Sequence, residues 1–404
     1  MANALLTPQA VTREALALFI NSFAFLKGVD RQYDSSFAKD GGKIGDTLKI
    51  RLPNDYIVRS GPTAVPQDTV EQNTTLQITS QKGIDVSFSS ADRTLKMDDY
   101  KARVLRPAMN NLAADVASDL MTSAEGIPSL VRNVDGSNNT ISPTANTWLT
   151  AGAMLDGYGV PRGDNRKIIM DPYTQANTVG SLSGLFNNQQ KIGQQYNSGQ
   201  MGEALGFDWM MDQSTILHTT GTYTTASTMN GAAQSGSTIT VTATSGTLKQ
   251  GDVITIAGVN AINRSSKRSL GKLQQFAVTA DVAAGATSIP IYPAITASAG
   301  RTVPFATVDV APANGAAVNL VGKASEVYRK NIALDGRAFT FASADLILPT
   351  GAVMEAERAS FGGVSMRLIT DYNSTSDQVL TRLDILYGWK LVRPEFAVVV
   401  ADQL

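Results

Sequence analysis

From about residue 222 to residue 335, the middle of the chain loses the helical spacing of apolar residues that earlier segments show. Thr, Ser, Ala, Gly and Val dominate it, and alternating runs such as TLKQGDVITIAGV at 247–259 lie between Gly and Pro residues. Such runs are typical of a small β-barrel or β-sandwich. The candidate strands are Thr238–Thr244, Asp252–Ala257, Gln274–Thr279, Thr287–Ile291 and Ala317–Leu320. The chain is therefore either a series of separate domains or one fold with an all-β insertion.

The N-terminal segment is predicted to be an amphipathic helix over residues 8–26, because its apolar residues recur at helical spacing. Thr7 can act as the N-cap, and Pro8 suits the first helical position. One interpretation is a terminal helix that packs on the core of its own subunit. The other is an arm that docks on a neighbouring subunit.

Residues 43–90 change to the two-residue period of half-buried strands, seen in DTLKIRLP, LQITS and GIDVSF. The connection between the first two strands, NDYIVRSGPTAVPQDTVEQNTT, is polar and far longer than the roughly two to five residues of an ordinary hairpin loop. It is either an irregular surface loop or an extended two-stranded arm. Since an isolated hairpin is marginal in water, such an arm would need another surface to lie on.

Residues 98–125 carry the strongest helix signal, a single apolar stripe that runs from Tyr100 to Leu120. Asp98 is a suitable N-cap, and the helix would be about 40 Å long. A helix of that length in a chain of this size is a scaffold element. Pro107 should kink it, because proline cannot donate the backbone hydrogen bond of a helix interior.

The remaining segments are predicted to be mixed. A helix is expected over 147–157, and RKIIMDP is a buried strand that runs into a second helix. After residue 338, FTFASADLIL, MRLITDY and LTRLDILYGWKLVRPEFAVVVA are strand candidates, with a connection at Gly351–Glu357. Pro394 interrupts the last strand and would fit an edge position or a bulge.

The composition narrows the functional classes. Charged residues are 17% of the 404 residues, where about 25% is usual, which suits a surface that largely meets other protein. The formal net charge of −1 and the scattered basic residues do not fit a basic nucleic-acid binder. The chain has no cysteine, which excludes disulfides, thiolate metal sites and cysteine nucleophiles.

The sequence offers no set of catalytic residues. His218 is the only histidine, no G-x-S-x-G motif accompanies it, and a lone histidine is more often structural than catalytic. Acidic pairs occur at Asp98/Asp99, which suits a helix start, and at Glu355/Glu357, but nothing singles out a hydrolase pair. No catalytic residue, metal site or cofactor is predicted.

Four segments, which follow one another along the chain, resemble segments of a known protein family. They are the strand pair and helix from DTLKIRLP to NNLAADVASDLM, MGEALGFDWMMDQS, TLKQGDVITIAGV, and LYGWKLVRPEFAVVVA with its Tyr-Gly and Arg-Pro. The chain resembles the coat (major capsid) proteins of tailed bacteriophages over most of its length. It is most similar to the P22-like branch, which builds the Hong Kong 97 fold with an extra inserted domain.

The resemblance implies an α+β fold with a small β-barrel inserted. The expected parts are an N-terminal arm at 1–40, an extended β-hairpin loop at 41–90, a spine helix and peripheral domain at 91–146, an apical domain at 147–221, the inserted β-domain at 222–340, and a return to the apical and peripheral domains at 341–404. The hairpin loop would lie over the adjacent subunit. Its candidate contact residues are Asp55, Tyr56, Arg59, Gln67, Asp68 and Glu71.

The resemblance also implies partners. The chain would self-assemble through hexamers and pentamers into an icosahedral shell, in the host cytoplasm, with a scaffolding protein and a portal. Double-stranded DNA would fill the shell without specific contacts, and no membrane would be involved. The sequence departs from the family pattern at YTTASTMNGAAQSGST, which replaces a long charged loop. The insertion is therefore expected to stabilise its own subunit and not to bridge capsomers.

Three alternatives remain open. The chain could be another virion protein, a secreted β-rich adhesin or, less favoured, a hydrolase. An adhesin needs an export signal, and MANALLTPQAVTREALALFI has no basic residue before its apolar run, which Arg13 and Glu14 interrupt.

Overall fold

A computed structural model describes residues 8–22, 24–34, 47–59, 61–64, 66–69, 71–89, 104–163, 165–182, 202–349, 351 and 353–404. The chain forms two compact units, each assembled from separate stretches. The first comprises Met1–Arg51, Asn73–Leu120 and Phe339–Val392, and the second comprises Leu52–Gln72, Met121–Ala338 and Arg393–Leu404. Helices and strands are mixed in both, which confirms the predicted α+β class.

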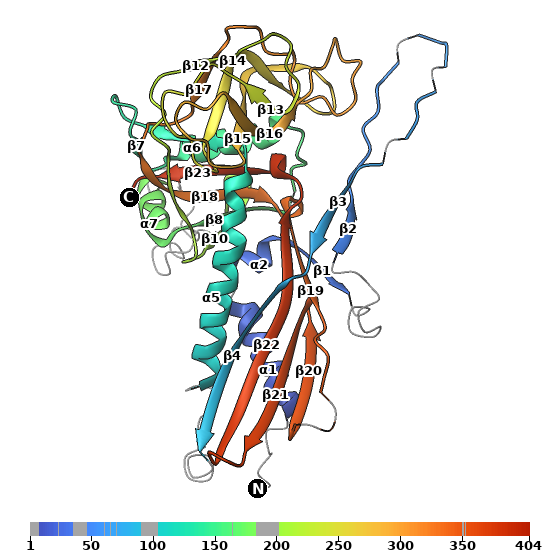
Figure 1. The fold of residues 1–404 in the computed structure, drawn as a ribbon, viewed down its shortest axis with the longest axis vertical. Helices are drawn as coiled ribbons and strands as arrows, with labels where there is room; N and C mark the ends of the chain where they lie inside the picture. The colour runs from blue at the N-terminus through green and yellow to red at the C-terminus, as the bar shows by residue number, and fades with distance from the viewer. Residues whose placement is uncertain are drawn as a thin grey trace. The chain divides into compact units, whose positions relative to one another are not determined.

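The first unit is built on a long, mainly antiparallel sheet (Figure 1). Its strands are β1 (Asp30–Asp34), β4 (Ser80–Ser89), β19 (Phe339–Ala344), β20 (Glu355–Phe361), β21 (Val364–Asn373) and β22 (Gln378–Leu391). The 14-residue β22 is central: β4 pairs along one edge, while β21 and then β19 pair along the other. Strand β1 adds to β19 in parallel.

The N-terminal helix packs on its own subunit, which is the first of the two interpretations. The described parts of the predicted helix are α1 (Pro8–Ser22) and α2 (Ala24–Gly28), and both Thr7 and Phe23 lie outside the described residues. Helix α1 lies against β20 and β21, and it buries Ala15, Leu16 and Phe19.

The spine helix is present as α5 (Arg106–Thr122), preceded by a π-helical turn at Val104 and Leu105. Pro107 lies two residues after this π-helical turn, an irregularity that fits a proline, which cannot donate the backbone hydrogen bond of an α-helix. The predicted start at residues 98–103 lies outside the described residues. Lys82 of β4 forms ion pairs with Asp115 and Asp119 of α5 at 2.6 and 2.7 Å.

The predicted hairpin is β2 (Thr47–Arg51) paired with β3 (Asn73–Gln77), with Arg51 opposite Asn73. Its apolar face packs with Ala342, Ala344 and Leu386 of the sheet. Gly388 lets the ribbon approach β22 closely, because a Cβ there would lie 2.0 Å from the Gln77 carbonyl oxygen.

The second unit holds a seven-stranded sheet in the order β5-β23-β18-β8-β10-β9, with β11 added to β18. These strands are β5 (Leu130–Val131), β8 (Arg166–Met170), β9 (Glu203–Ala204), β10 (Phe207–Met211), β11 (Leu217–Thr219), β18 (Val327–Asp335) and β23 (Ala397–Asp402). Helix α6 (Ala145–Gly157) covers one face through Trp148, Ala151 and Leu155. The other elements are α7 (Pro172–Leu182), a short ribbon of β6 (Asn133–Val134) and β7 (Thr140–Ile141), and the 3-10 turns at Ser123–Gly126, Gly336–Ala338 and Pro394–Phe396.

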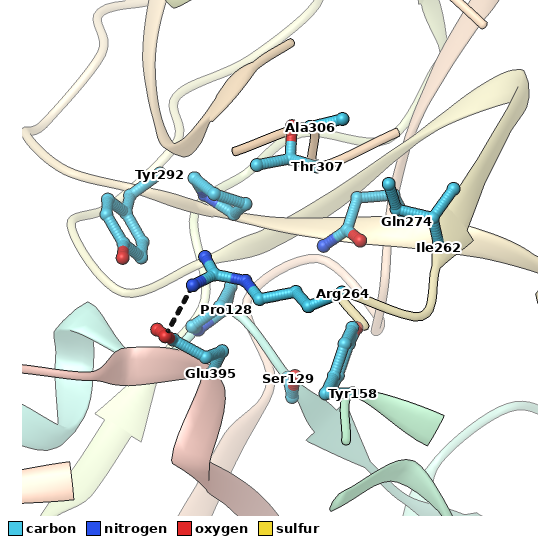
Figure 2. A pocket seen from close by; sticks show the side chains of 11 residues that line it. Pro128, Ser129, Tyr158, Ile262, Arg264, Gln274, Tyr292, Ala306, Thr307 and Glu395 are labelled. Carbon is cyan, nitrogen blue, oxygen red and sulfur yellow. Dashed lines mark hydrogen bonds and ion pairs between the residues drawn. The ribbon is translucent and has the colours of Figure 1, made fainter. Parts of the chain in front are cut away.

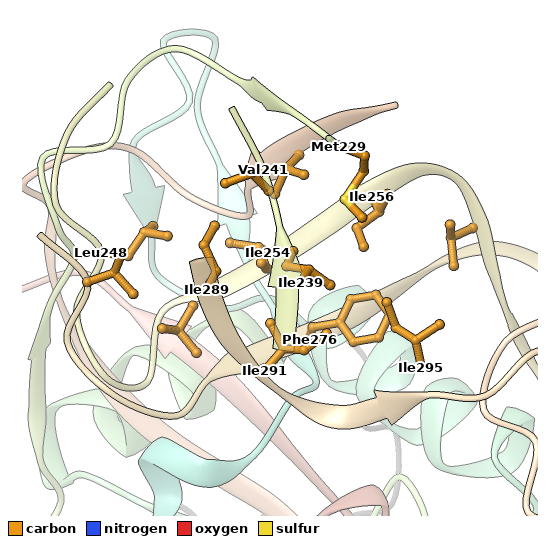
Figure 3. Close-up of a cluster of buried hydrophobic side chains, with 14 of the residues drawn as sticks. Met229, Ile239, Val241, Leu248, Ile254, Ile256, Phe276, Ile289, Ile291 and Ile295 are labelled. Carbon is orange, nitrogen blue, oxygen red and sulfur yellow. The ribbon is translucent and has the colours of Figure 1, made fainter. Parts of the chain in front are cut away.

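The mid-chain β segment of the sequence forms a six-stranded antiparallel sheet in the order β12-β17-β14-β15-β16-β13. The strands are β12 (Ser227–Thr228), β13 (Gly236–Thr240), β14 (Val253–Ile262), β15 (Ser269–Val278), β16 (Ser288–Ile295) and β17 (Ala317–Leu320). A bridge between Met229 and Val241 joins its two ends, so that the sheet closes into a barrel. Ile254, Phe276 and Ile289 lie fully buried in its core (Figure 3).

Two strand predictions were wrong. The connection expected at Gly351–Glu357 overlaps β20, which begins at Glu355. The single C-terminal strand is two strands, β22 and β23, which belong to different sheets, and Pro394 begins the 3-10 turn between them. Proline has no N–H for a strand ladder, which explains why pairing stops there. Strand β18 lies within the range expected for the inserted domain but pairs with β8 and β23.

In the part of the chain that the structure describes, no helix is both long and apolar enough to cross a membrane.

Candidate assembly interface

The long connection between β2 and β3, residues 52–72, is called the arm loop below. The N–H of Leu52 donates to the Gln72 carbonyl at 2.9 Å, which continues the hairpin by one pair beyond the strands. Further along the arm loop, the Gln67 side chain makes the hydrogen bonds that a paired strand would otherwise make. The Ile57 N–H donates to Gln67 Oε1 at 2.9 Å, and Gln67 Nε2 donates back to the Ile57 carbonyl at 2.5 Å. One side-chain amide thus ties the two limbs of the arm loop together.

Among the described residues of the arm loop, two large apolar side chains are exposed. Tyr56 is 53% exposed and Val58 is 89% exposed. Hydrogen bonds with Thr69 and Asn54 lower the pKa of the Tyr56 phenol, and Thr69 belongs to the opposite limb of the loop. Val58 was missed at the sequence level. Its signal was a β-branched apolar residue beside Ile57 in an otherwise polar connection.

The charged candidates of the arm loop have different surroundings. Arg59 donates to the Gly61 carbonyl, which curls its side chain back onto the loop. Asp68 and Glu71 are exposed. Asp55 instead has partners within the same compact unit: the Phe305 N–H donates to its Oδ2 at 2.7 Å, and Lys267 Nζ forms an ion pair with the same oxygen. Five of the six candidates thus lie on the exposed loop surface, and the Asp55 carboxylate is held by the barrel segments.

The lone histidine lies in a buried polar cluster. His218 Nε2 is 2.9 Å from Asp252 Oδ1, and Asp252 Oδ2 accepts hydrogen bonds from the N–H groups of Gly221 and Lys249 at 3.0 and 2.7 Å. His218 is 3% exposed and Asp252 is 0% exposed, so neither side chain can reach a substrate. The pair holds the turn before β14 to strand β11, which is a structural role.

Lys330 lies beside this cluster, 2% exposed, with its Nζ donating to the Gly251 carbonyl at 3.2 Å. Gly251 has φ +87°, and a Cβ there would lie 2.8 Å from Lys330 Nζ, so the turn needs glycine. Burial lowers the pKa of Lys330 to about 8, and the nearby charges of Glu125 and Asp252 oppose that shift.

This lowered pKa predicts a pH dependence of stability. Between about pH 8 and pH 10.5 the unfolded chain keeps the Lys330 proton that the folded chain has lost, so the free energy of unfolding should rise with pH. Relative to Lys330→Met, the rise should reach about 3 kcal/mol. Urea unfolding of both proteins at pH 7 and pH 10.5 measures it, and equal slopes of stability against pH would contradict it.

A cavity of about 20 Å³ lies among Tyr158, Arg264, Gln274, Tyr292 and Glu395 (Figure 2). An ion pair of 2.9 Å joins Arg264 to Glu395 across it. Desolvation raises the pKa of both tyrosines above the ordinary value. That volume accommodates about one water molecule and excludes a substrate. In the described part of the chain, no group of three or more His, Asp or Glu residues could hold a metal ion.

The model of a family described as "P22 coat protein - gene protein 5" matches residues 3–400. No curated protein matches the chain.

Among solved structures, the capsid of Ralstonia phage GP4 is similar at 8% identity, covering 93% of this chain and 86% of that one, with a TM-score of 0.45. A structure titled Mycobacterium phage Che8 is similar at 12% identity over 95% and 90% of the two chains, with a TM-score of 0.43. The CUS-3 coat protein I-domain matches 24% of this chain and 96% of its own length at 28% identity, with a TM-score of 0.20.

Proposed function

This chain belongs to the P22 coat protein family, and from that premise we propose that the arm loop is the element by which one subunit holds the next in the shell. The family membership confirms the predicted major capsid protein and its Hong Kong 97-type fold. Such a protein self-assembles into the icosahedral shell of a tailed bacteriophage and is a component of the virion.

One observation supports the arm loop as the contact: it carries exposed apolar side chains on a braced backbone. Tyr56 and Val58 leave apolar surface in water, and a bound neighbour would cover it. The bonds between Ile57 and Gln67 order the loop in advance, so less conformational entropy is lost on docking. A modest contact suffices, because closed symmetry repeats it at every subunit of the shell.

The finer functional predictions follow as proposals. The subunits form hexamers and pentamers, assembly occurs in the host cytoplasm with a scaffolding protein and a portal, and DNA fills the shell without specific contacts. Near-neutral net charge supports that last point, since condensing a genome needs an excess of basic residues. The chain acts as a structural protein and not as an enzyme, which the burial of His218 and Asp252 supports.

The domain assignment is likewise a proposal. The inserted β-domain corresponds to the closed barrel of β12–β17, and it stabilises its own subunit. The strand pairing supports an end of the barrel at β17, because β18 is part of the seven-stranded sheet.

Electron microscopy of the purified full chain tests the shell function directly. We expect closed shells or rings of five and six subunits in negative stain, and sedimentation well ahead of a 42.8 kDa monomer. A preparation that stays monomeric at high concentration, alone and with a scaffolding protein from a related phage, would contradict the proposal.

A further inference from the structure

The barrel carries a receptor for a carboxylate, formed by the Lys267 ammonium and the Phe305 N–H. Lys267 lies in the turn between β14 and β15. Asn263 braces this turn, because its Oδ1 accepts from the N–H groups of Ser265 and Ser266 at 3.1 and 2.9 Å and its carbonyl accepts from the Lys267 N–H at 2.8 Å. The receptor is thus built from backbone and side chain of the barrel segments alone.

The receptor needs a negative partner. Lys267 is 5% exposed, and an ammonium removed from water is costly unless an opposite charge and hydrogen bonds compensate it. Asp55 supplies both, since its Oδ2 accepts from Lys267 and from the Phe305 N–H at once. The Asp55 side chain itself is only 23% exposed. This is a partly buried, charge-assisted contact and not a surface ion pair.

The contact between Asp55 and the receptor matters because of where Asp55 lies in the arm loop. Asp55 lies between Leu52, which bonds to Gln72, and Ile57, which bonds to Gln67. Fixing Asp55 therefore fixes the stretch that presents Tyr56 and Val58. Without it, the connection would have to be ordered when a neighbour docks, at a cost in conformational entropy.

We propose that the barrel holds the arm loop through Asp55 in the receptor of its own chain, and so sets the direction of the loop before a second copy of this chain docks on it. This inference rests on the proposed function. It adds that the barrel positions the arm loop before the loop contacts a neighbouring subunit. The partner is a second copy, which meets the exposed side of the arm loop while the receptor stays occupied within the subunit.

The first test is made on the unassembled subunit. Asp55→Asn should increase the rate at which an arginine-specific protease cleaves after Arg59, by at least about fivefold, because the freed loop opens more often. Asp68→Asn, which changes another acidic residue of the arm loop, is the matched control and should leave the rate unchanged. Equal cleavage rates in the Asp55→Asn and unaltered chains would overturn the proposal.

The second test uses charge exchange. Asp55→Lys and Lys267→Asp each place like charges in the receptor, and each should raise the concentration needed for half-maximal assembly by roughly fivefold or more. The double variant D55K/K267D restores opposite charges within one chain and should return both cleavage protection and assembly to near the unaltered values. Failure of the double variant to regain protection, when its circular dichroism shows a folded chain, would overturn the proposal.

A mixture of the two single variants decides which chain fills the receptor. In an equimolar mixture, opposite charges can meet only between copies. We expect the mixture to assemble as poorly as either variant alone, and full recovery would overturn the intrachain contact in favour of exchange between subunits. If the unaltered chain formed no shells, the proposed function would fail, while the cleavage comparison would still decide whether the brace exists.

Discussion

A chain in which residues 53–71 are replaced by Asn-Gly is expected to fold and to form no shells. The register places Arg51 opposite Asn73, and Leu52 bonds to Gln72, so a two-residue type I′ turn closes the hairpin without changing its pairing. The shortened chain also carries Lys267→Met, so that no buried ammonium is left without its carboxylate. Electron microscopy and sedimentation measure assembly, and thermal unfolding by circular dichroism measures the fold.

A second variant tests the exposed surface of the arm loop without changing the length of the loop. Val58→Asp keeps every hydrogen bond described for the loop and places a charge at a position that is 89% exposed. It should weaken assembly strongly, since the side chain would be buried unpaired beneath a neighbour. Normal shells from the shortened chain would remove the arm loop from the assembly mechanism altogether.

Asp252→Ala is expected to be the most destabilising single change in the barrel region. The carboxylate accepts from His218, Gly221 and Lys249 in a site that water does not reach. Its removal leaves buried donors without partners and should lower the free energy of unfolding by about 3 to 5 kcal/mol. Urea unfolding monitored by circular dichroism measures the loss.

The matched control is Asp281, which contacts the same turn from the connection between β15 and β16. Asp281 accepts from the Gln250 N–H at 2.8 Å and from Lys249 Nζ at 3.3 Å, but it lies on the surface. Because water can replace the lost partner, Asp281→Ala should lower the free energy of unfolding far less than Asp252→Ala does. Equal losses from the two substitutions would contradict the structural role given to Asp252.

The sequence predicts the individual helices and strands well, but it does not predict which sheet each strand joins. The hairpin, α5, α6 and the barrel strands were recognisable because apolar spacing reports which face of an element is buried. The same signal cannot tell which sheet a strand joins. Strands β22 and β23 are both apolar and close in sequence, yet they pair in different sheets, and β18 is as apolar as the barrel strands that precede it.

For the candidate interface, the sequence indicated the arm loop but not its internal contacts. An unusually long polar connection was a usable signal, and the exposure of Tyr56 agrees with it. The pairing of Asp55 with Lys267 joins residues 212 positions apart, and no local pattern of the sequence reports such a contact. Gln67 is a predicted contact with a neighbouring subunit, and its side-chain amide joins the two limbs of the loop.

The interleaved course of the chain has a consequence during synthesis. Strands β1 and β4 leave the ribosome early, but they pair with β19 and β22, which end only at residues 344 and 391. Until then the apolar faces of these early strands have no sheet to join, and exposed strand edges favour aggregation. The barrel strands, by contrast, are contiguous from residue 227 to residue 320 and can pair before the C-terminal strands exist. A nascent coat subunit can therefore complete its barrel at residue 320, whereas the sheet of the first unit lacks its central strand until residue 391.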